Sequence, residues 1–318
     1  MSPRSPEELL NEARGGSRAA LARLITYVES AGEMHRATSE LLTSAGAPHV
    51  IGITGAPGAG KSTLTDRLLT AALAHASFGA GHSFARVAVL CVDPSSPFSG
   101  GALLGDRYRM QAHATDDRVY IRSMATRGNL GGLSLAVPDA VRVLGAAGFE
   151  FVILETVGVG QMEVDVASTA DTTVVVLNPG WGDAVQADKA GILEVADVFV
   201  INKADRAGVV ETRRDLERML DMGEVMPWRA AVVETVASEG RGVEDLWTEL
   251  VRHHHFLDGG ERKLRRRRRL SQELDRVLSA LLHESVHSGQ AQVRYEEQLD
   301  LLMAGVIDPQ RAARALLF

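Results

Sequence analysis

The sequence has little of several features that mark common protein classes. Its 318 residues include a single cysteine, Cys91, so an internal disulfide and a zinc site built from several thiolates are both excluded. No stretch approaches the roughly 20 apolar residues that a membrane-spanning helix needs. The first residues include Glu7, Glu8 and Glu12 and no apolar segment, so we expect neither a signal peptide nor a transit peptide. These absences favour a cytoplasmic protein with no membrane partner.

Charge and composition narrow the class further. Lys and Arg number 34 against 41 Asp and Glu, which gives a formal net charge of −7. This acidic balance argues against a protein that binds nucleic acid. Hydrophobic residues make up 45% and charged residues 24%, as in ordinary globular domains. The length predicts one large domain with helical attachments, or two domains.

Six short apolar segments alternate with helical patterns in the middle of the chain. They lie at residues 49–54, 86–93, 151–158, 172–180, 198–205 and 230–238. Strands without strict alternation of apolar and polar residues are buried on both faces of a sheet. We therefore predict an α/β fold with a doubly wound, mostly parallel sheet, whose ligands bind at the carboxyl ends of the strands.

Helical patterns flank this region on both sides. Residues 6–45 show helical spacing of apolar residues, with Gly15 and Gly16 separating two short helices. Beyond about residue 252 the chain is helical and highly charged. We predict a helical N-terminal extension over residues 1–47, a nucleotide-binding domain over 48–252 and a helical C-terminal segment over 253–318.

The strongest motif is the P-loop pattern G-x-x-x-x-G-K-S, which lies between a predicted strand and a predicted helix. Its glycines let successive backbone N–H groups face one anion, and the following helix adds its positive end. Lys61 is expected to reach the β- and γ-phosphates, Ser62 to bind Mg²⁺ and Thr63 to contact the α-phosphate. The rest of the expected phosphate cradle is Gly55, Ala56, Pro57, Gly58, Ala59 and Gly60.

A second motif, N-K-x-D, follows a later strand and predicts the base. The Asp205 carboxylate can accept two hydrogen bonds from guanine, and adenine lacks that pair of donors, so the motif favours GTP. Lys203 can lay its stem over the base, next to Asn202. After another strand, a backbone N–H of the loop Val236, Ala237 and Ser238 could meet the guanine O6.

Carboxylates at strand ends are candidates for magnesium binding and for catalysis. Asp93 and Glu155 each end a predicted strand, and each could hold Mg²⁺ or orient the attacking water. Asp106 is a third candidate metal ligand. Gly158 could donate its N–H to the γ-phosphate and sense hydrolysis. No glutamine directly follows Gly158, and Gln161 is the nearest catalytic candidate, beside Lys61, Asp93 and Glu155.

Together these residues resemble the MeaB/ArgK/MMAA family of GTPases, a branch of the SIMIBI-class P-loop proteins. The matching stretches are GITGAPGAGKSTL, VDPSSPFSGGALLGDR, RSMATRGNLGGLS, ETVGVGQMEVDVA and PGWGDAVQADKAGILEVADVFVINKAD. The resemblance implies a GTP-hydrolysing chaperone of an adenosylcobalamin-dependent acyl-CoA mutase, most often methylmalonyl-CoA mutase. It also implies GTP or GDP and Mg²⁺ as ligands, and a homodimer formed through the C-terminal helices, which would make 253–318 a dimerisation arm.

The resemblance also assigns roles to individual residues. It implies a magnesium shell of Ser62, Asp93, Asp106 and Glu155. It places an extra switch, which couples the nucleotide to the mutase, at residues 179–191, with Asp183, Gln186 and Lys189 as its contact residues. Residues 123–134 are expected to form a mobile, glycine-rich loop that exposes Arg127. We expect slow intrinsic turnover that the partner accelerates.

Two other functions stay open. A GTPase metallochaperone of the nickel-delivery kind shares this sheet, but such proteins usually carry a Cys/His cluster near the nucleotide, and here only Cys91 is available. A small-molecule kinase, as an older amino-acid-transport label for the family suggests, would need a substrate pocket and a lid. It would not need the N-K-x-D motif.

Three features of the C-terminal segment need an interpretation. His253, His254 and His255 are expected to form a polar domain edge, because adjacent residues on a helix point in different directions. The arginines at 265–269 are expected to be a solvated helix face that pairs with acidic groups of a second subunit or a partner. An apolar stripe fits a dimer interface or packing on the nucleotide domain equally well; it comprises Leu270, Leu274, Val277, Leu278 and Leu281.

Overall fold

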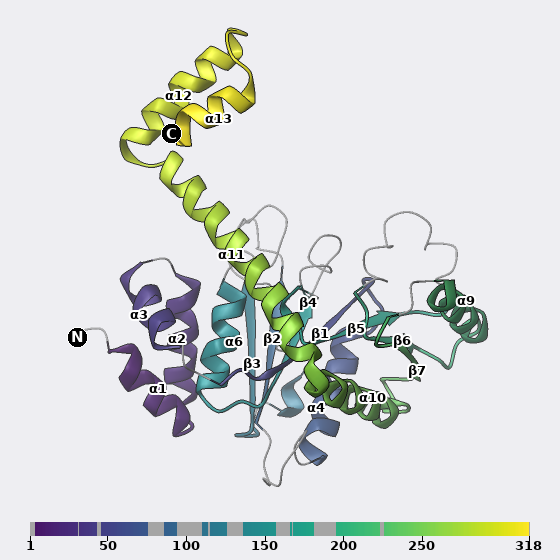
Figure 1. Cartoon of the computed structure of the whole chain (residues 1–318). Helices are drawn as coiled ribbons and strands as arrows, with labels where there is room; N and C mark the ends of the chain where they lie inside the picture. The colour runs from purple at the N-terminus through teal and green to yellow at the C-terminus, as the bar shows by residue number, and fades with distance from the viewer. Residues whose placement is uncertain are drawn as a thin grey trace. The chain divides into compact units, whose positions relative to one another are not determined.

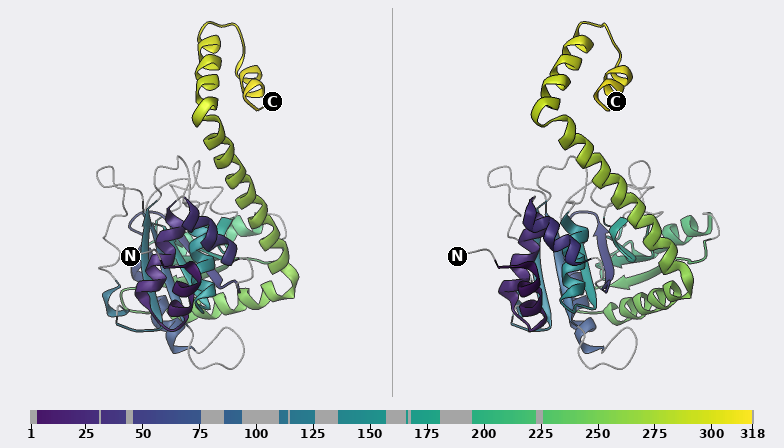
Figure 2. Two further views of the ribbon diagram at one scale, coloured as in Figure 1. Left: turned by 90° about the vertical axis from the view of Figure 1, so that its left-hand side faces the viewer. Right: turned by 60° about the vertical axis from the view of Figure 1, so that its left-hand side comes forward.

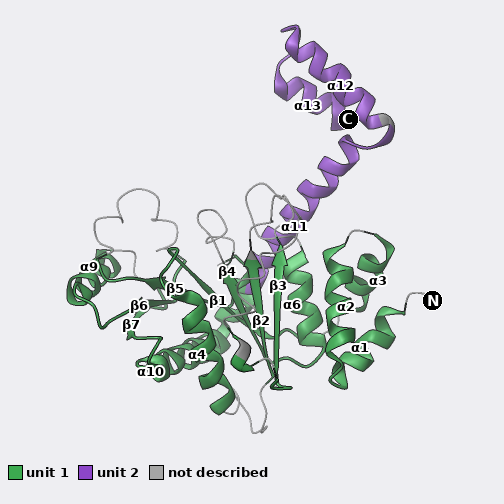
Figure 3. Cartoon of the chain, turned by 180° about the vertical axis from the view of Figure 1, so that it is seen from behind, with its two compact units in different colours: residues 1–265 green, residues 266–318 purple. Residues whose placement is uncertain are grey.

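A computed structural model describes most of the chain in two compact units. The described residues are 4–30, 32–42, 46–75, 86–93, 110–113, 115–125, 136–156, 166, 168–180, 195–222 and 226–317. The first unit comprises residues 1–265 and the second residues 266–318 (Figure 3). The first unit therefore continues past the predicted boundary at residue 253.

The first unit is built on a seven-stranded sheet with the order β3-β2-β4-β1-β5-β6-β7 (Figure 1). Every recorded strand pair is parallel, which confirms the predicted sheet. The strands are β1 (His49–Gly55), β2 (Val87–Asp93), β3 (Val119–Ala125), β4 (Phe151–Thr156), β5 (Thr172–Leu177), β6 (Val198–Asn202) and β7 (Ala231–Thr235).

Helices cover both faces of this sheet, as β5 illustrates. Its residues Val174 and Val176 belong to the same buried cluster as side chains of α4 (Lys61–Ala74) and α10 (Val243–Phe256). The alternate residues, Val175 and Leu177, pack with α9 (Val209–Met222) on the other face. The helix α6 (Ala136–Ala146) shares a third cluster with β2 and β4. This double coverage explains why the strands are apolar at successive positions.

The N-terminal extension folds onto the sheet unit. It forms α1 (Pro6–Arg14), α2 (Arg18–Glu29) and α3 (Glu33–Leu41), and the glycines at 15 and 16 separate the first two, as predicted. Leu9, Leu24 and Ile25 are buried in one cluster with residues of α6. Figure 2 shows these helices beside the sheet. The extension therefore belongs to the first unit.

The edge strand β3 was not predicted. Residues 123–125 lie in this strand, so the predicted loop is wrong at its start, and residues 126–135 lie outside the described part of the chain. The strand pairs only with β2 among the described strands, and its middle residues are half-buried. Its Arg122 forms an ion pair with Glu29 of α2. An edge strand with a polar middle lacks the apolar run that marks the central strands.

The second unit is helical. The helix α11 (Arg262–Val286) crosses the division between the units, and α12 (Gly289–Met303) and α13 (Pro309–Leu317) follow it. All five residues of the predicted apolar stripe are exposed, between 40% and 58%. In the described chain no helix combines the length and the apolar character needed to cross a bilayer.

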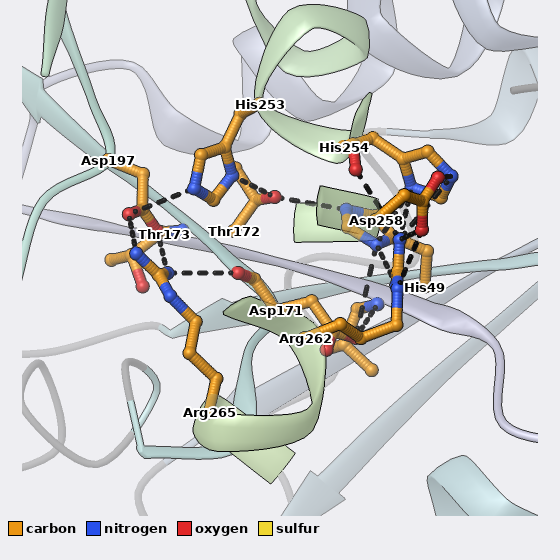
Figure 4. A network of polar contacts seen from close by, with 11 residues as sticks. His49, Asp171, Thr172, Thr173, Asp197, His253, His254, Asp258, Arg262 and Arg265 are labelled. Carbon is orange, nitrogen blue, oxygen red and sulfur yellow. Dashed lines mark hydrogen bonds and ion pairs between the residues drawn. The ribbon is translucent and has the colours of Figure 1, made fainter. Parts of the chain in front are cut away.

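A buried polar cluster at the amino ends of β5 and β6 overturns two expectations (Figure 4). His253 is fully buried rather than at a polar edge: its Nδ1 lies 2.8 Å from Thr172 Oγ1 and its Nε2 lies 3.2 Å from Asp197 Oδ1. Arg265 is not part of a solvated face, because it donates to both Asp197 oxygens at 2.9 and 2.8 Å. The start of α11 is thereby anchored to the sheet of its own chain.

His49 belongs to the same cluster and makes stability depend on pH. Burial lowers its pKa from 6.5 to about 3; Asp171 raises it, and His254, Arg262 and His253 lower it. Between these pH values the unfolded chain binds a proton that the folded chain does not. The contribution of His49 to the free energy of unfolding is therefore fully present above pH 6.5 and decreases as the pH is lowered towards 3.

We expect His49→Gln to flatten this acid dependence. One proton corresponds to a slope of about 1.4 kcal/mol per pH unit in the free energy of unfolding. Urea denaturation between pH 7 and pH 5 measures the slope for the wild type and the variant. His255→Gln is the control, because its ring is exposed and the wild-type slope should persist. Equal slopes for His49→Gln and the wild type would contradict the prediction.

Candidate functional site

The predicted polar motifs converge on one edge of the sheet. Gly55, Asp93, Glu155, Asn202 and Thr235 lie at or next to the carboxyl ends of β1, β2, β4, β6 and β7. Because all these strands are parallel, their carboxyl ends meet at the same edge. The register aligns Ile53 of β1 with Glu155, and Asn202 with Thr235. The structure therefore gathers residues that are up to 180 positions apart in the sequence.

The loop after β1 needs glycine at three positions. Gly55, Gly58 and Gly60 have φ values of +134°, +72° and +92°, which L side chains rarely adopt. A Cβ at Gly55 would lie 2.1 Å from the carbonyl oxygen of Val176, and one at Gly60 would lie 2.3 Å from Asn202 Nδ2. The loop is thus shaped by backbone that only glycine allows.

Lys61 is the first residue of α4, and its ammonium group lies over this loop. It donates to the carbonyl oxygens of Gly55 at 2.6 Å and Ala56 at 3.2 Å, and only 7% of the residue is exposed. A cation in this position adds to the positive end of α4. The loop therefore offers an anion both a fixed charge and the N-terminus of a helix.

Ser62 and Glu155 form a buried oxygen pair beside the loop. The Ser62 hydroxyl donates to Glu155 Oε1 at 2.6 Å, and both residues are buried. Glu155 lies within β4, one residue before its end, so its backbone is fixed to the sheet. Hydroxyl and carboxylate oxygens are ligands that Mg²⁺ accepts.

Asn202 ties the phosphate loop to both segments predicted to contact the base. Its Nδ2 donates to the carbonyl oxygen of Ala59 at 2.8 Å. Its Oδ1 accepts from Thr235 Oγ1 and from the Ala237 N–H, both at 3.0 Å. The residue is 2% exposed, so these hydrogen bonds are shielded from water. Asn202 therefore connects the phosphate loop, its own loop after β6 and the loop after β7.

Lys203 has a strained backbone next to this anchor. Among the described residues it is the one non-glycine residue with a positive φ, at +60°. Its Nζ donates to the carbonyl oxygen of Gly58 at 2.6 Å, so the side chain reaches back across the phosphate loop. Strain of this kind concentrates at functional sites. Asp205, two residues later, is exposed, as is Thr63 of α4.

Two contributors escaped the sequence reasoning. Thr235 is 1% exposed and binds Asn202; its place directly before the predicted base loop was the available signal. Arg67 of α4 donates to the carbonyl oxygens of Ala237 and Ser238. No sequence signal pointed to Arg67, since its partners lie about 170 residues away.

Several predicted site residues lie wholly or partly outside the described part of the chain. The side chain of Asp93 is not described, although its backbone ends β2 as expected. Outside the described residues lie Asp106, Arg127, Gly158, Gln161, Asp183, Gln186 and Lys189. Their roles stay predictions. Within the described ranges, no group of three or more His, Cys, Asp or Glu side chains could hold a metal ion, and Cys91 is buried in β2.

Comparison with known proteins gives consistent similarities. The family model described as "Methylmalonyl Co-A mutase-associated GTPase MeaB" matches residues 21–291. A putative GTPase of Pyrococcus abyssi is 44% identical over 98% of this chain and 95% of its own length. The mouse protein "Methylmalonic aciduria type A homolog, mitochondrial" is 34% identical over 95% of this chain and 76% of its own.

One solved structure is similar over nearly the whole length. It is described as a crystal structure of "LAO/AO transport system kinase" and superimposes with a TM-score of 0.72 at 26% identity. The match covers 98% of this chain and 96% of that one. The likeness thus includes the sheet, the phosphate loop and the flanking helices.

Proposed function

Because this chain belongs to the MeaB family of GTPases, we propose that its GTP hydrolysis serves as a molecular chaperone for an adenosylcobalamin-dependent acyl-CoA mutase. Methylmalonyl-CoA mutase is the first candidate, and the nucleotide state would gate cofactor loading and protect the mutase. The observation that carries this proposal is the match of residues 21–291 to a family described as mutase-associated. The mouse relative's name, which refers to methylmalonic aciduria, supports it.

The phosphates of GTP or GDP would bind at the loop after β1. The backbone of Gly55–Gly60, with its positive φ values at Gly55, Gly58 and Gly60, would curl around the phosphates. Lys61 would add its charge at the β- and γ-phosphates, and Thr63 would contact the α-phosphate. Lys61 already makes hydrogen bonds to the loop, so its ammonium is held in place before charge develops on the γ-phosphate. Such preorganised charge is the main source of rate acceleration in phosphoryl transfer.

The residues beside the loop fit magnesium. Ser62 and Glu155 offer two buried hard oxygens 2.6 Å apart, and we propose that they hold the ion together with Asp93 and Asp106. When bound, the ion would neutralise charge on the phosphate oxygens. The roles of Gly158 at the γ-phosphate and of Gln161 near the attacking water belong to the same proposal.

Guanine would be read by Asp205, with Lys203 stacked on the base and Asn202 holding the surrounding loops. The exposed Asp205 carboxylate leaves its two acceptor oxygens accessible to a base. The loop Val236, Ala237 and Ser238 would supply a backbone N–H to the guanine O6. The anchoring of that loop by Asn202 supports this arrangement.

We expect Asp205→Asn to change the preferred base. An amide presents one donor and one acceptor, which match the C2 carbonyl and the N1–H of xanthine, whereas guanine loses one hydrogen bond and faces a donor. GDP affinity should fall about 100-fold and XDP affinity should rise above it. Isothermal titration calorimetry with both nucleotides measures the change. Asp215→Asn, on the exposed surface of α9, should leave both affinities unchanged; an Asp205→Asn protein that still prefers GDP would contradict the prediction.

The helical second unit supports a homodimer. The exposed apolar side chains on α11 lie at helical spacing and extend the surface that a second copy could cover. We therefore propose that residues 253–318 include the dimerisation arm. The proposal places the protein in the cytoplasm, with no nucleic acid and no membrane as partner.

The test combines binding and turnover. Calorimetry would measure affinity for purified candidate mutases in the presence of GDP and of a non-hydrolysable GTP analogue, and a phosphate assay would follow GTP hydrolysis with and without each mutase. Affinity that depends on the nucleotide, together with faster hydrolysis, supports the proposal. The switch residues Asp183, Gln186 and Lys189 would then be replaced by alanine, and we expect the acceleration to be lost while intrinsic hydrolysis persists.

No binding and no acceleration with any candidate would remove the mutase assignment and leave the GTPase activity intact. The name of the similar solved structure then favours a kinase. Transfer of phosphate from ATP to a small molecule, in preference to GTP hydrolysis, would establish that alternative. Stoichiometric nickel binding by the purified protein would establish a metallochaperone instead.

A further inference from the structure

Arg67 joins the helix that carries the phosphate lysine to the loop predicted to contact guanine. It lies six residues after Lys61 on α4. Its Nε donates to the carbonyl oxygen of Ala237 at 3.2 Å, and its Nη2 donates to that of Ser238 at 3.1 Å. The planar guanidinium thus holds two successive peptide groups, which a lysine ammonium cannot do with fixed geometry.

These two contacts fix the direction of a backbone donor. The peptide group between Ala237 and Ser238 is planar and trans, so its N–H, which belongs to Ser238, points opposite to its carbonyl. Because Arg67 holds the Ala237 carbonyl, the Ser238 N–H is turned away from α4. The second contact prevents the next peptide group from rotating, and the N–H of that group, on Glu239, donates to the Val236 carbonyl at 2.9 Å.

The other amides of this loop already have partners within the chain. The Val236 N–H donates to the Arg241 carbonyl, and the Ala237 N–H donates to Asn202 Oδ1, both at 3.0 Å. Within the described part of the chain, the Ser238 N–H has no recorded acceptor. It is therefore the amide of the three that remains available to a ligand.

We propose that Arg67 is a positioning residue for base recognition: it fixes the Ala237–Ser238 peptide so that the Ser238 N–H meets the 6-oxo group of guanine. The inference rests on the proposed guanine site. Because Arg67 and Lys61 share one helix, the same rigid element positions the phosphate lysine and the base loop. Among the described residues, the hydrogen bonds of Arg67 reach the loop after β7 and not the phosphate loop, so the loss of Arg67 should weaken base recognition selectively.

The experiment compares nucleotides that differ at the base. Calorimetry would measure affinities of the wild type, Arg67→Met and Arg67→Lys for GDP, IDP and 6-thio-GDP. IDP keeps the 6-oxo group and lacks the 2-amino group, whereas 6-thio-GDP keeps both guanine N–H donors and replaces the 6-oxygen with sulfur, a weak acceptor. Arg241→Met is the matched control, because Arg241 lies on the same loop and its exposed side chain pairs only loosely with Glu239.

We expect Arg67→Met to weaken GDP and IDP about fivefold, and 6-thio-GDP less than twofold. Arg67→Lys should recover part of the loss, and Arg241→Met should show none. If Arg67→Met lowered the affinity for all three nucleotides equally, Arg67 would act through the fold or the phosphates, and the inference would be overturned. An unchanged affinity for GDP would overturn it as well. Failure of the wild type to bind GDP would instead remove the proposed guanine site.

Discussion

Replacing Lys61 with methionine is expected to lower the rate of GTP hydrolysis at least about 1,000-fold. Methionine keeps most of the length and apolar character of the side chain but removes its charge. The ammonium group lies over the phosphate loop, where it donates to the carbonyl oxygens of Gly55 and Ala56, and the residue as a whole is only 7% exposed. A charge in such a shielded position stabilises developing negative charge far more than one in water.

Single-turnover hydrolysis with saturating protein measures this loss without a contribution from product release. Lys263→Met is the control, because Lys263 is exposed and should keep wild-type rates. Thermal unfolding should show that the Lys61→Met protein remains folded. A folded variant whose rate stays within tenfold of the wild type would mean that Lys61 does not face the reacting phosphate.

Removing the Asp197 carboxylate is expected to destabilise the first unit by about 3–5 kcal/mol. Burial opposes ionisation of this group, but hydrogen bonds from His253 and Arg265 outweigh it and lower the pKa of Asp197 below its ordinary value. Asp197 also accepts from the Thr173 N–H at 2.8 Å. Asp197→Ala removes the acceptor of these donors, and the half-buried Arg265 charge, which loses its carboxylate partner, carries most of the cost.

Urea denaturation at pH 7 measures the effect, with Asp221→Ala as the matched control. Asp221 also pairs with an arginine, Arg229 at 2.6 Å, but it is 63% exposed, so its loss should cost less than about 1 kcal/mol. The double variant Asp197→Ala with Arg265→Met should be more stable than Asp197→Ala alone, because no charge is left unpaired. Similar losses for Asp197→Ala and Asp221→Ala would show that the buried cluster does not anchor α11.

The central strands and the phosphate loop can be predicted from local sequence for a physical reason. A strand buried on both faces must be apolar at successive positions, so β1, β4, β5 and β6 stand out as runs. A backbone that must adopt positive φ around an anion needs glycine, so Gly55, Gly58 and Gly60 mark the phosphate loop. In both cases, burial or backbone conformation restricts the residue type at each position separately.

The wrong and missing predictions concern residues whose environment is set by distant parts of the chain. The strand β3 has a half-buried, polar middle that only its pairing with β2 and its contact with α2 explain. His253 and Arg265 are predicted at the surface because histidine and arginine usually lie there. It is the distant Asp197 that allows His253 to be buried and Arg265 to be half-buried.

The chain's local pattern alone was enough to establish a parallel α/β sheet, a phosphate loop and a GTPase motif, because propensity, burial and glycine geometry act over a few neighbouring residues. The tertiary structure decided which distant groups complete the site. Asn202 bridges to Ala59 and Ala237, and Arg67 reaches Ser238, across separations of up to about 170 residues. Hydrogen bonds between such groups depend on how the strands and helices pack in space, and that packing leaves no mark in the local sequence.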